Sequence, residues 1–489
     1  MSWLLLSLLA SAQEAPMEEA TVDAEPEVVV ATPDRSRLPD VTPPTLLPLP
    51  QMQELPVVEG ITAYIVPVEG VRKVDVTVYL HRGGVDFEGY VSVAHEANGW
   101  LQDIATGSRS AGEIAVYEDY WDSDVWTSSG GLLRQTVNVS VPAEDLDRGL
   151  DLLTDIMVDP KYPGREIKVF KNERFRYYMD EAVNSPSAIA SSLRDMGWYT
   201  ADSAYGTRPD LDAVAGLTRG DLRARHADIL GNAPISVLVV GDVNPQEVVE
   251  MLRVRMGEYG TAGEESERPG FSPAGDRRIL AVDMPDAEQA SVLVRMPAPL
   301  LDANDRVAFS AVSWAYGGHF MSRINANLRE DKGITYGAGA RYRGGWKTAT
   351  FDIGVDVPAE HVQVAMTEIE AELAKLAANG MTDSELSAKS LEDIGWWNSV
   401  LQTSDSASSF YQSRLLDGED VNAPRGRIEA LQGLTPADTQ ATAQAWLGED
   451  SARLWAVVGP RSVIEEQLEA MNLPIQWVEP SDAIMGNFE

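Results

Sequence analysis

The sequence predicts an α+β protein of two tandem homologous domains, each a largely antiparallel sheet with helices packed on one face. Strand-like stretches such as ITAYIV (61–66) alternate with amphipathic helical stretches such as AEDLDRGLDLLTDIM (143–157). Three short landmarks also recur in the same order about 215 residues further along the chain, which indicates a duplicated domain. The landmark pairs are 141–144 with 357–360, 216–218 with 433–435, and Gly241 with Gly459.

The N-terminal region precedes both predicted domains. Residues 1–12 hold an apolar run that ends in Ala-Ser-Ala, a pattern typical of a cleaved signal peptide, although no Lys or Arg precedes the run. We therefore expect an exported, periplasmic protein; the alternative is a cytoplasmic protein with an apolar first helix. Residues 13–54 are rich in Pro, Glu, Ala and Val without a helical period, which predicts a disordered tether. No later run reaches the roughly 18 to 20 apolar residues of a membrane span.

The two predicted domains are separated by a polar, Gly-rich segment. We expect an N-terminal domain at 55–259, a linker at 260–278 and a C-terminal domain at 279–489. The formal net charge of −37 makes binding to nucleic acid unfavourable. Cysteine is absent, so thiol nucleophiles and thiolate metal sites are excluded.

One short stretch superficially suggests a metal site. His95 and Glu96 stand together in a helical run, and a zinc hydrolase helix needs two His one turn apart with a nearby Glu. The chain has only five His, and no two lie three to five residues apart, so no single helix can supply a His pair. We interpret His95 and Glu96 as surface or helix-entry residues.

Longer motifs point to a known family. RGG at 82–84, GSRS at 107–110, VPAEDLDRGLDLLTDIMVDPKYP at 141–163 and NERFRYYMDE at 172–181 occur in that order. DAEQASVLVRMPAP, YGGHFMSRINANLREDKGITYGA and ARLWAVVGP follow in the second half. Together these motifs resemble the insulinase and pitrilysin family of inverted-motif (H-x-x-E-H) zinc peptidases, which includes mitochondrial processing peptidase.

The resemblance implies where the zinc site of that family falls in this chain. Anchoring the family's zinc helix on Gly107 places its first His at Asn98, its Glu base at Leu101 and its second His at Gln102. The third ligand falls on or near Asp180 or Glu181. Because an amide is a poor zinc ligand and Leu101 cannot accept a proton, we expect no zinc and no catalysis by this chain alone.

The resemblance also implies substrate-binding residues in the second half. Arg329 and Tyr336 match the Arg/Tyr pair that reaches toward the substrate backbone in that family, and both can donate hydrogen bonds to a peptide carbonyl. The alternative is that Arg329 pairs with a neighbouring acidic residue while Tyr336 packs in a strand. A flexible segment before them is expected to line the same chamber: Gly317, Gly318, His319 and Phe320.

The function implied is that of a zinc-free, substrate-binding subunit. Its expected partners are a zinc-bearing homologous peptidase subunit, which would hold the zinc, and a peptide substrate. One alternative is a scaffold or peptide-binding protein of the same fold without a part in hydrolysis. Another is an active peptidase with an unusual metal site around His95, Glu96 and Asp180.

Overall fold

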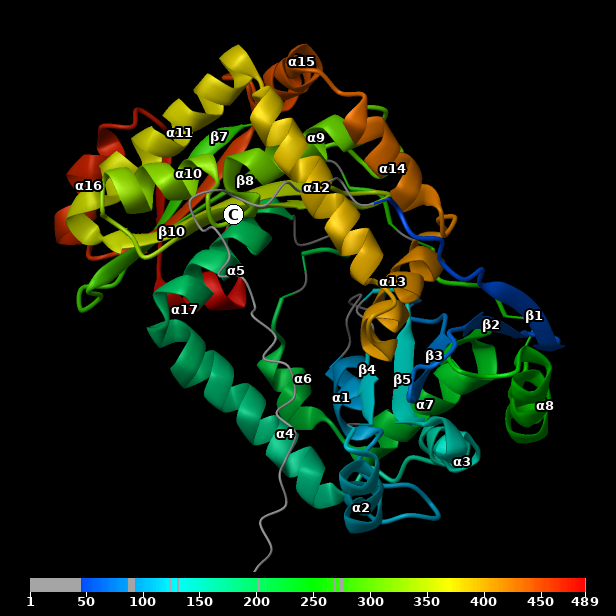
Figure 1. The fold of residues 1–489 in the computed structure, drawn as a ribbon. Helices are drawn as coiled ribbons and strands as arrows, with labels where there is room; N and C mark the ends of the chain where they lie inside the picture. Colours follow the sequence, from blue (N-terminus) through cyan, green and yellow to red (C-terminus); the bar gives the residue numbers. More distant parts are fainter. Residues whose placement is uncertain are drawn as a thin grey trace, which may run out of the picture. The chain divides into compact units, whose positions relative to one another are not determined.

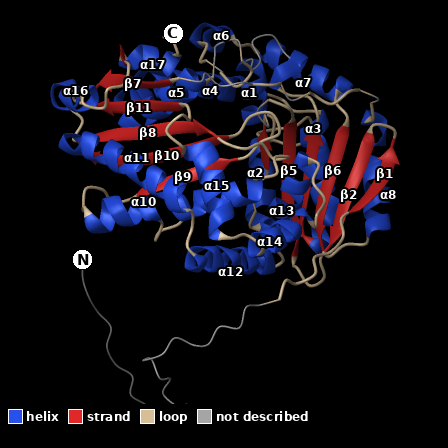
Figure 2. Cartoon of the chain, turned by 90° about the horizontal axis from the view of Figure 1, so that it is seen from above, coloured by secondary structure: helices blue, strands red, loops and turns tan. Residues whose placement is uncertain are grey.

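The computed structural model describes residues 45–86, 93–123, 125–129, 132–199, 203–206, 208–261, 263–267, 269–271 and 276–488. The chain divides into two units, Met1–Pro43 and Pro44–Glu489, and the described helices and strands belong to the second. That unit contains two six-stranded sheets, one from each half of the sequence (Figure 1, Figure 2).

The first sheet has the strand order β1-β2-β6-β3-β5-β4. Only β2 and β6 run parallel, and all other neighbours are antiparallel. Its strands are β1 (Gln53–Val58), β2 (Ile61–Pro67), β3 (Lys73–Leu80), β4 (Trp126–Ser128), β5 (Gln135–Pro142) and β6 (Ile235–Gly241).

The helices of the first half include two with reciprocal capping boxes, Ser110 with Glu113 on α2 and Thr218 with Asp221 on α7. The α-helices are α1 (Val93–Leu101), α2 (Ala111–Trp121), α3 (Leu146–Val158), α4 (Gly164–Arg176), α5 (Pro186–Trp198), α6 (Leu211–Gly216), α7 (Arg219–Asn232) and α8 (Pro245–Met256). Short 3₁₀ or π turns are η1 (Gly84–Asp86), η2 (Ala143–Asp145), η3 (Tyr177–Glu181), η4 (Ala182–Asn184) and η5 (Gly257–Tyr259).

The second sheet repeats the order of five strands of the first, but its edge strand β12 runs parallel to β7, whereas β1 is antiparallel to β2. Its order is β12-β7-β11-β8-β10-β9, so that β7, β11, β8, β10 and β9 correspond to β2, β6, β3, β5 and β4. The repeat recognised in the sequence is therefore a repeat of strand order. The strands are β7 (Arg277–Asp283), β8 (Gln289–Pro297), β9 (Ala338–Arg343), β10 (Thr350–Pro358), β11 (Arg453–Gly459) and β12 (Ile475–Val478).

Among the described residues, the second half carries the two longest helices, α11 (Val362–Asn379) and α12 (Asp383–Ser399). Its other helices are α9 (Arg306–Ser313), α10 (Arg323–Asn325), α13 (Ser404–Asp417), α14 (Ala423–Gln432), α15 (Pro436–Leu447), α16 (Arg461–Glu469) and α17 (Pro480–Met485). Its short turns are the π-helical η6 (Trp314–Gly318) and η7 (Ala326–Asp331) and the 3₁₀ turn η8 (Ala359–His361). None of the helices in the described part of the chain has the length and apolar character needed to cross a bilayer.

Each sheet is covered on one face by helices of its own half, as the sequence predicts, and on the other face by the other half. Helix α5 of the first half packs on β8 and β11 of the second sheet, and α13 of the second half packs on β3 and β6 of the first (Figure 1). Every residue of β6 and of β11 is buried, because these central strands have a layer on both faces. The two halves thus complete each other's cores.

An N-terminal strap, residues 45–52, also joins the halves. Its Leu46, Leu49 and Met52 pack on the apolar cluster shared by β2, β3, β6, α12 and α13. The Trp397 indole N–H donates to the carbonyl of Leu47 at 2.7 Å, and the Tyr411 hydroxyl donates to that of Pro50 at 2.7 Å. The strap lies inside the range 13–54 that the composition assigns to a disordered tether. It packs on the two halves because its leucines bury apolar surface there.

Candidate functional site

Helix α1 buries all the positions at which the sequence places a degenerate zinc motif. Asn98 and Gln102 have no exposed surface, and Leu101 is 3% exposed. Leu101 packs in a small apolar cluster with Ile167 and Phe170 of α4. These three positions are therefore core, and none of their side chains is ionisable.

A closed network of amides holds the two polar positions. The Asn98 side-chain amide donates to Gln135 Oε1 at 2.7 Å, and Gln135 donates in turn to Gln102 Oε1. Gln102 donates to the carbonyl of Ile156 at 2.9 Å, while the Tyr162 hydroxyl donates to Asn98 Oδ1. Each side-chain oxygen already accepts a hydrogen bond within a fully buried network.

These residues do not fit a zinc ion. Zinc sites in proteins use thiolate, imidazole and carboxylate ligands, whereas Asn98 and Gln102 offer neutral amide oxygens that are committed to Gln135 and Tyr162. Among the described residues, no group of three His, Asp or Glu side chains could hold a metal ion. Sequence reasoning did not find Gln135, whose signal is a polar residue at the start of a strand that is otherwise apolar on its buried face.

Asp180 lies away from this network. It is exposed in the π turn η3, where its backbone carbonyl accepts from the Asn184 amide at 2.6 Å. Its neighbour Glu181 forms an ion pair with Arg176 at 3.2 Å. Among the described residues, neither carboxylate forms a hydrogen bond with Asn98 or Gln102.

The sequence predicts that His95 is a surface or helix-entry residue: it lies in the first turn of α1, but the surface alternative is wrong. His95 has no exposed surface, and its Nε2 lies 3.0 Å from the carbonyl oxygen of Ser129, to which it donates. Glu96 points the other way and forms an ion pair with Arg174 of α4. Burial raises the pKa of Glu96, and Arg174 opposes that shift. His95, Glu96 and Asp180 thus have separate partners and do not form one site.

Asp103 follows the buried face of α1. Its Oδ2 accepts from the backbone N–H of Thr127 at 2.9 Å. Burial raises the pKa of Asp103 to about 6, which outweighs the hydrogen bonds from Thr127 that favour its charged form. A carboxyl with this pKa titrates near neutral pH.

Arg329 and Tyr336 lie on either side of the bend between η7 and β9. The Arg329 guanidinium stacks over the Phe320 ring at 4.4 Å, and its Nε lies 3.5 Å from Glu330 Oε1. Tyr336 is 92% exposed and lies outside any strand, so the alternative in which it packs in a strand is wrong. The alternative ion pair of Arg329 with a neighbouring acid is present.

The segment 317–320, which the sequence predicts to be flexible, is in part closely packed. A Cβ at Gly317 would lie 2.5 Å from the backbone nitrogen of Ala340 in β9, so only glycine fits this contact. The His319 ring stacks on Trp314 with centroids 3.9 Å apart, and its Nδ1 donates to the Trp314 carbonyl at 3.1 Å. Gly318 has no such close neighbour. Phe320 remains 63% exposed beneath Arg329.

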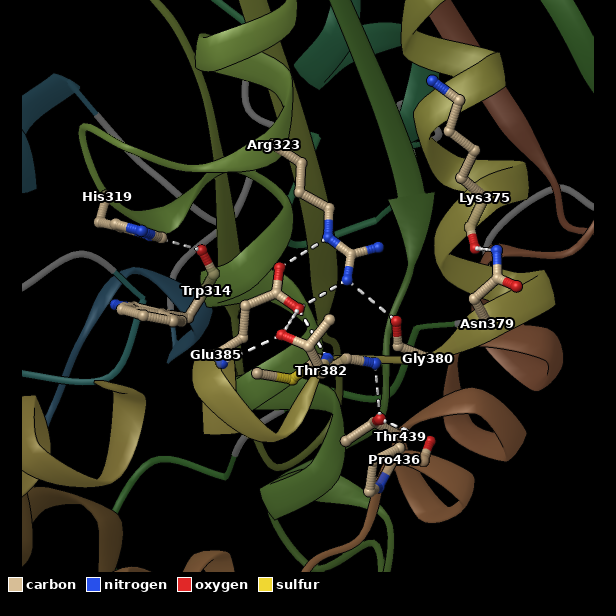
Figure 3. A network of polar contacts seen from close by, with 11 residues as sticks. Trp314, His319, Arg323, Lys375, Asn379, Gly380, Thr382, Glu385, Pro436 and Thr439 are labelled. Carbon is tan, nitrogen blue, oxygen red and sulfur yellow. Dashed lines mark hydrogen bonds and ion pairs between the residues drawn. The ribbon is translucent and has the colours of Figure 1, made fainter. Parts of the chain in front are cut away.

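An ion pair anchors the helix that leads to Arg329. Arg323 of α10 donates to both carboxylate oxygens of Glu385, at 2.8 and 2.7 Å, and to the carbonyl of Gly380 at 3.0 Å (Figure 3). Glu385 also completes the capping box of α12 by accepting from Thr382. This arrangement fixes α10 and η7 against α12.

Residues 216–390 match a family model described as Peptidase M16 inactive domain. This match places residues 216–390 in the insulinase-like M16 peptidase family. The matched residues run from the end of the first half through most of the second and include both Arg329 and Tyr336.

Relatives of this chain include proteases and a solved inactive domain. An uncharacterized zinc protease of Streptomyces coelicolor is 23% identical over 329 residues, which cover 65% of this chain and 70% of the relative. The peptidase M16 inactive domain from Pseudomonas fluorescens has a TM-score of 0.74 at 17% identity and covers 84% of this chain and 98% of its own. The periplasmic protease PqqL of Escherichia coli has a TM-score of 0.70 at 14% identity, over 89% of this chain and 49% of that chain. These structures establish the M16 fold of the two sheets.

Two features of this chain thus stand out. Asn98 and Gln102, which the sequence predicts at the family's zinc-ligand positions, belong to a buried amide network, whereas Tyr336 is exposed and Arg329, predicted as its pair, is partly exposed. The first feature is incompatible with metal ligation, and the second leaves hydrogen-bond donors accessible.

Proposed function

We propose that this chain is the zinc-free, substrate-binding subunit of a two-chain peptidase and pairs with a zinc-bearing homologue. One observation carries the proposal: Asn98 and Gln102 are locked together through Gln135, while Tyr336 is 92% exposed. A chain whose Asn98 and Gln102 are unsuited to zinc, but which presents a phenol and part of a guanidinium to solvent, is suited to binding a peptide.

The chemistry expected of the pair is electrostatic. The Arg329 guanidinium and the Tyr336 hydroxyl can both donate to a substrate carbonyl, and donors aimed at developing negative charge stabilise the transition state of acyl transfer. The partner would supply zinc, its ligands and the general base that activates water. Arg329 would have to leave Glu330 but can remain stacked on Phe320 while it does so.

The same proposal includes export to the periplasm. The apolar run and the small-residue pattern of residues 1–12 support it, as does the periplasmic location of the Escherichia coli structural relative.

The test is hydrolysis of a quenched fluorescent peptide library by this chain, by a zinc-bearing homologue, and by their equimolar mixture, with zinc content measured for each. We expect activity to be greatest in the mixture and zinc in the homologue alone. Arg329→Ala or Tyr336→Phe should lower kcat/KM of the mixture roughly 100- to 1000-fold, the range for loss of a transition-state donor.

Matched controls separate this effect from general damage. Tyr120 is 66% exposed on α2 and the Arg165 side chain is 89% exposed on α4, so Tyr120→Phe and Arg165→Ala should leave the rate unchanged. Equal rates for wild type and both site variants would contradict the proposed role.

A non-hydrolytic scaffold or peptide-binding protein is the second candidate. The observation that favours it is the internal packing of Arg329 between Phe320 and Glu330, which gives this residue a role without a substrate. Activity in the homologue alone that this chain does not change would favour the scaffold.

A further inference from the structure

A cavity of about 930 Å³ opens between the two halves, away from Arg329 and Tyr336. Its lining includes residues of α5, Glu96 of α1, and Arg295 and Arg343 of the second sheet. Apart from charged groups, the polar lining consists of hydroxyl side chains: Ser129, Tyr177, Tyr178, Ser187, Ser191, Ser192, Tyr199 and Tyr205. Its volume is in the range of ligand sites in proteins.

Three arginines of the lining share two carboxylates. Arg295, whose side chain is 4% exposed, binds Asp352 through two hydrogen bonds of 2.6 and 2.9 Å and lies 2.8 Å from Asp195. Asp195 also forms an ion pair with Arg194 at 3.0 Å. Arg343 reaches the same Asp352 at 3.3 Å and remains 55% exposed toward the cavity.

Arg208 is the fourth guanidinium of the lining, and no carboxylate of the described residues pairs with it. Its Nε is buried without a hydrogen-bond partner among those residues. The side chain is held by packing instead: a Cβ at Gly486 would lie 2.3 Å from Arg208 Nη1, next to the sulfur of Met196. Gly486, with φ at +69°, therefore leaves the space that this guanidinium uses.

The cavity consequently has an excess of positive charge. Four guanidinium groups line the cavity, and three of them pair with Asp195 and the adjacent Asp352. Asp210 adds a third negative charge while it caps α6, and the charge of Glu96 is balanced by Arg174, so the charge of one guanidinium is left over. A partly buried cation without a counterion is unfavourable. In a chain whose net charge is −37, such a site is suited to a single anionic group rather than to a polyanion.

We propose that this cavity binds the carboxylate of a peptide and that Arg208 recognises it. The inference deepens the proposed peptide-binding function and rests on it for the choice of ligand. A carboxylate can accept from the Arg208 guanidinium with charge assistance, and the serine and tyrosine hydroxyls can donate to or accept from the adjoining peptide groups.

The experiment measures binding to the full chain alone by fluorescence anisotropy. Three labelled peptides are compared. Two share one sequence and end in a free acid or an amide, and the third is an amide in which Glu replaces the last residue. We expect the free acid, the Glu-terminated amide or both to bind on the order of 10-fold more tightly than the plain amide, and the pattern identifies which carboxylate is recognised.

Variants assign the effect to Arg208. Arg208→Gln should reduce the preference for the carboxylate to within about 2-fold, and Arg208→Lys, which keeps the charge, should retain part of it. Arg165→Gln makes the same change of net charge on an exposed side chain outside the cavity and should leave the preference intact. Thermal unfolding of each variant shows that it is folded.

Two results would overturn the inference. One is wild-type binding that does not distinguish acid from amide, or no binding at millimolar peptide; the other is a folded Arg208→Gln variant that keeps the full preference. Hydrolysis by the two-chain mixture is measured separately, so a split peptidase without carboxylate preference refutes this site alone. Carboxylate-dependent binding without hydrolysis in any mixture refutes only the peptidase role.

Discussion

Asp103, the residue after Gln102, makes the stability of this protein depend on pH. Its folded-state pKa of about 6 lies above the value of about 4 expected in an unfolded chain. Folding therefore favours the protonated form, and stability is lost as the pH rises from about 4 to about 6. Above that range the penalty is constant.

Asp103→Asn should remove this penalty, since an amide oxygen can still accept from Thr127. We expect the free energy of unfolding at pH 8 to rise by on the order of 1–3 kcal/mol, and at pH 5 by about half as much. Urea unfolding at both pH values measures the difference. The exposed Asp119→Asn serves as a control, and a gain for Asp103→Asn that does not change with pH would contradict the assignment.

At the residue scale, the sequence predicts that Asn98 and Gln102 stand at the family's zinc-ligand positions, but it does not predict that both side chains are buried or what they bind. Their partners Gln135 and Tyr162 belong to other elements, and such contacts follow from packing between distant segments, which no local pattern records. The same limit explains His95, whose burial depends on the approach of Ser129.

At the scale of elements, the contact between α10 and α12 restrains the position of η7, which carries Arg329. Arg323→Leu would leave the partly buried Glu385 without its cation and remove the hydrogen bond to Gly380. Burial opposes the charge of Glu385, but the hydrogen bonds from Arg323 and Thr382 hold its pKa below the ordinary value.

We expect Arg323→Leu to lower the free energy of unfolding by on the order of 1–3 kcal/mol and to speed amide hydrogen exchange in η7. Arg461→Leu breaks an exposed i,i+4 pair with Glu465 and should cost at most about 1 kcal/mol. Exchange in η7 that is as slow in Arg323→Leu as in wild type would show that this ion pair does not hold the segment.

The alternation of strands and helices was predictable from local periodicity, and so was the repeated order of elements. The π turns η6 and η7 were not, because the hydrogen-bond shift that makes them comes from tertiary contacts such as that of Gly317 with β9. The second layer on each sheet could be inferred only in part: the apolar runs of β6 and β11 indicate two buried faces but do not say which helix covers them.

At the scale of the whole unit, the strap of residues 45–52 joins its two halves. Tyr411→Phe deletes the hydroxyl that donates to Pro50 and keeps the packing of the ring. We expect a loss of about 1 kcal/mol in stability and faster hydrogen exchange in the strap, both measured against Tyr120→Phe. Unchanged exchange in the strap would mean that its leucines alone hold it.

The exchange of α5 and α13 between the halves also has a consequence for synthesis. On the ribosome the first sheet is complete once β6 has emerged, yet the helices that cover its outer face lie beyond residue 382. Until they are translated, only the strap is available to cover Val66, Tyr79 and Leu238. Translation of the second half is therefore the interval in which this apolar surface is most prone to aggregation.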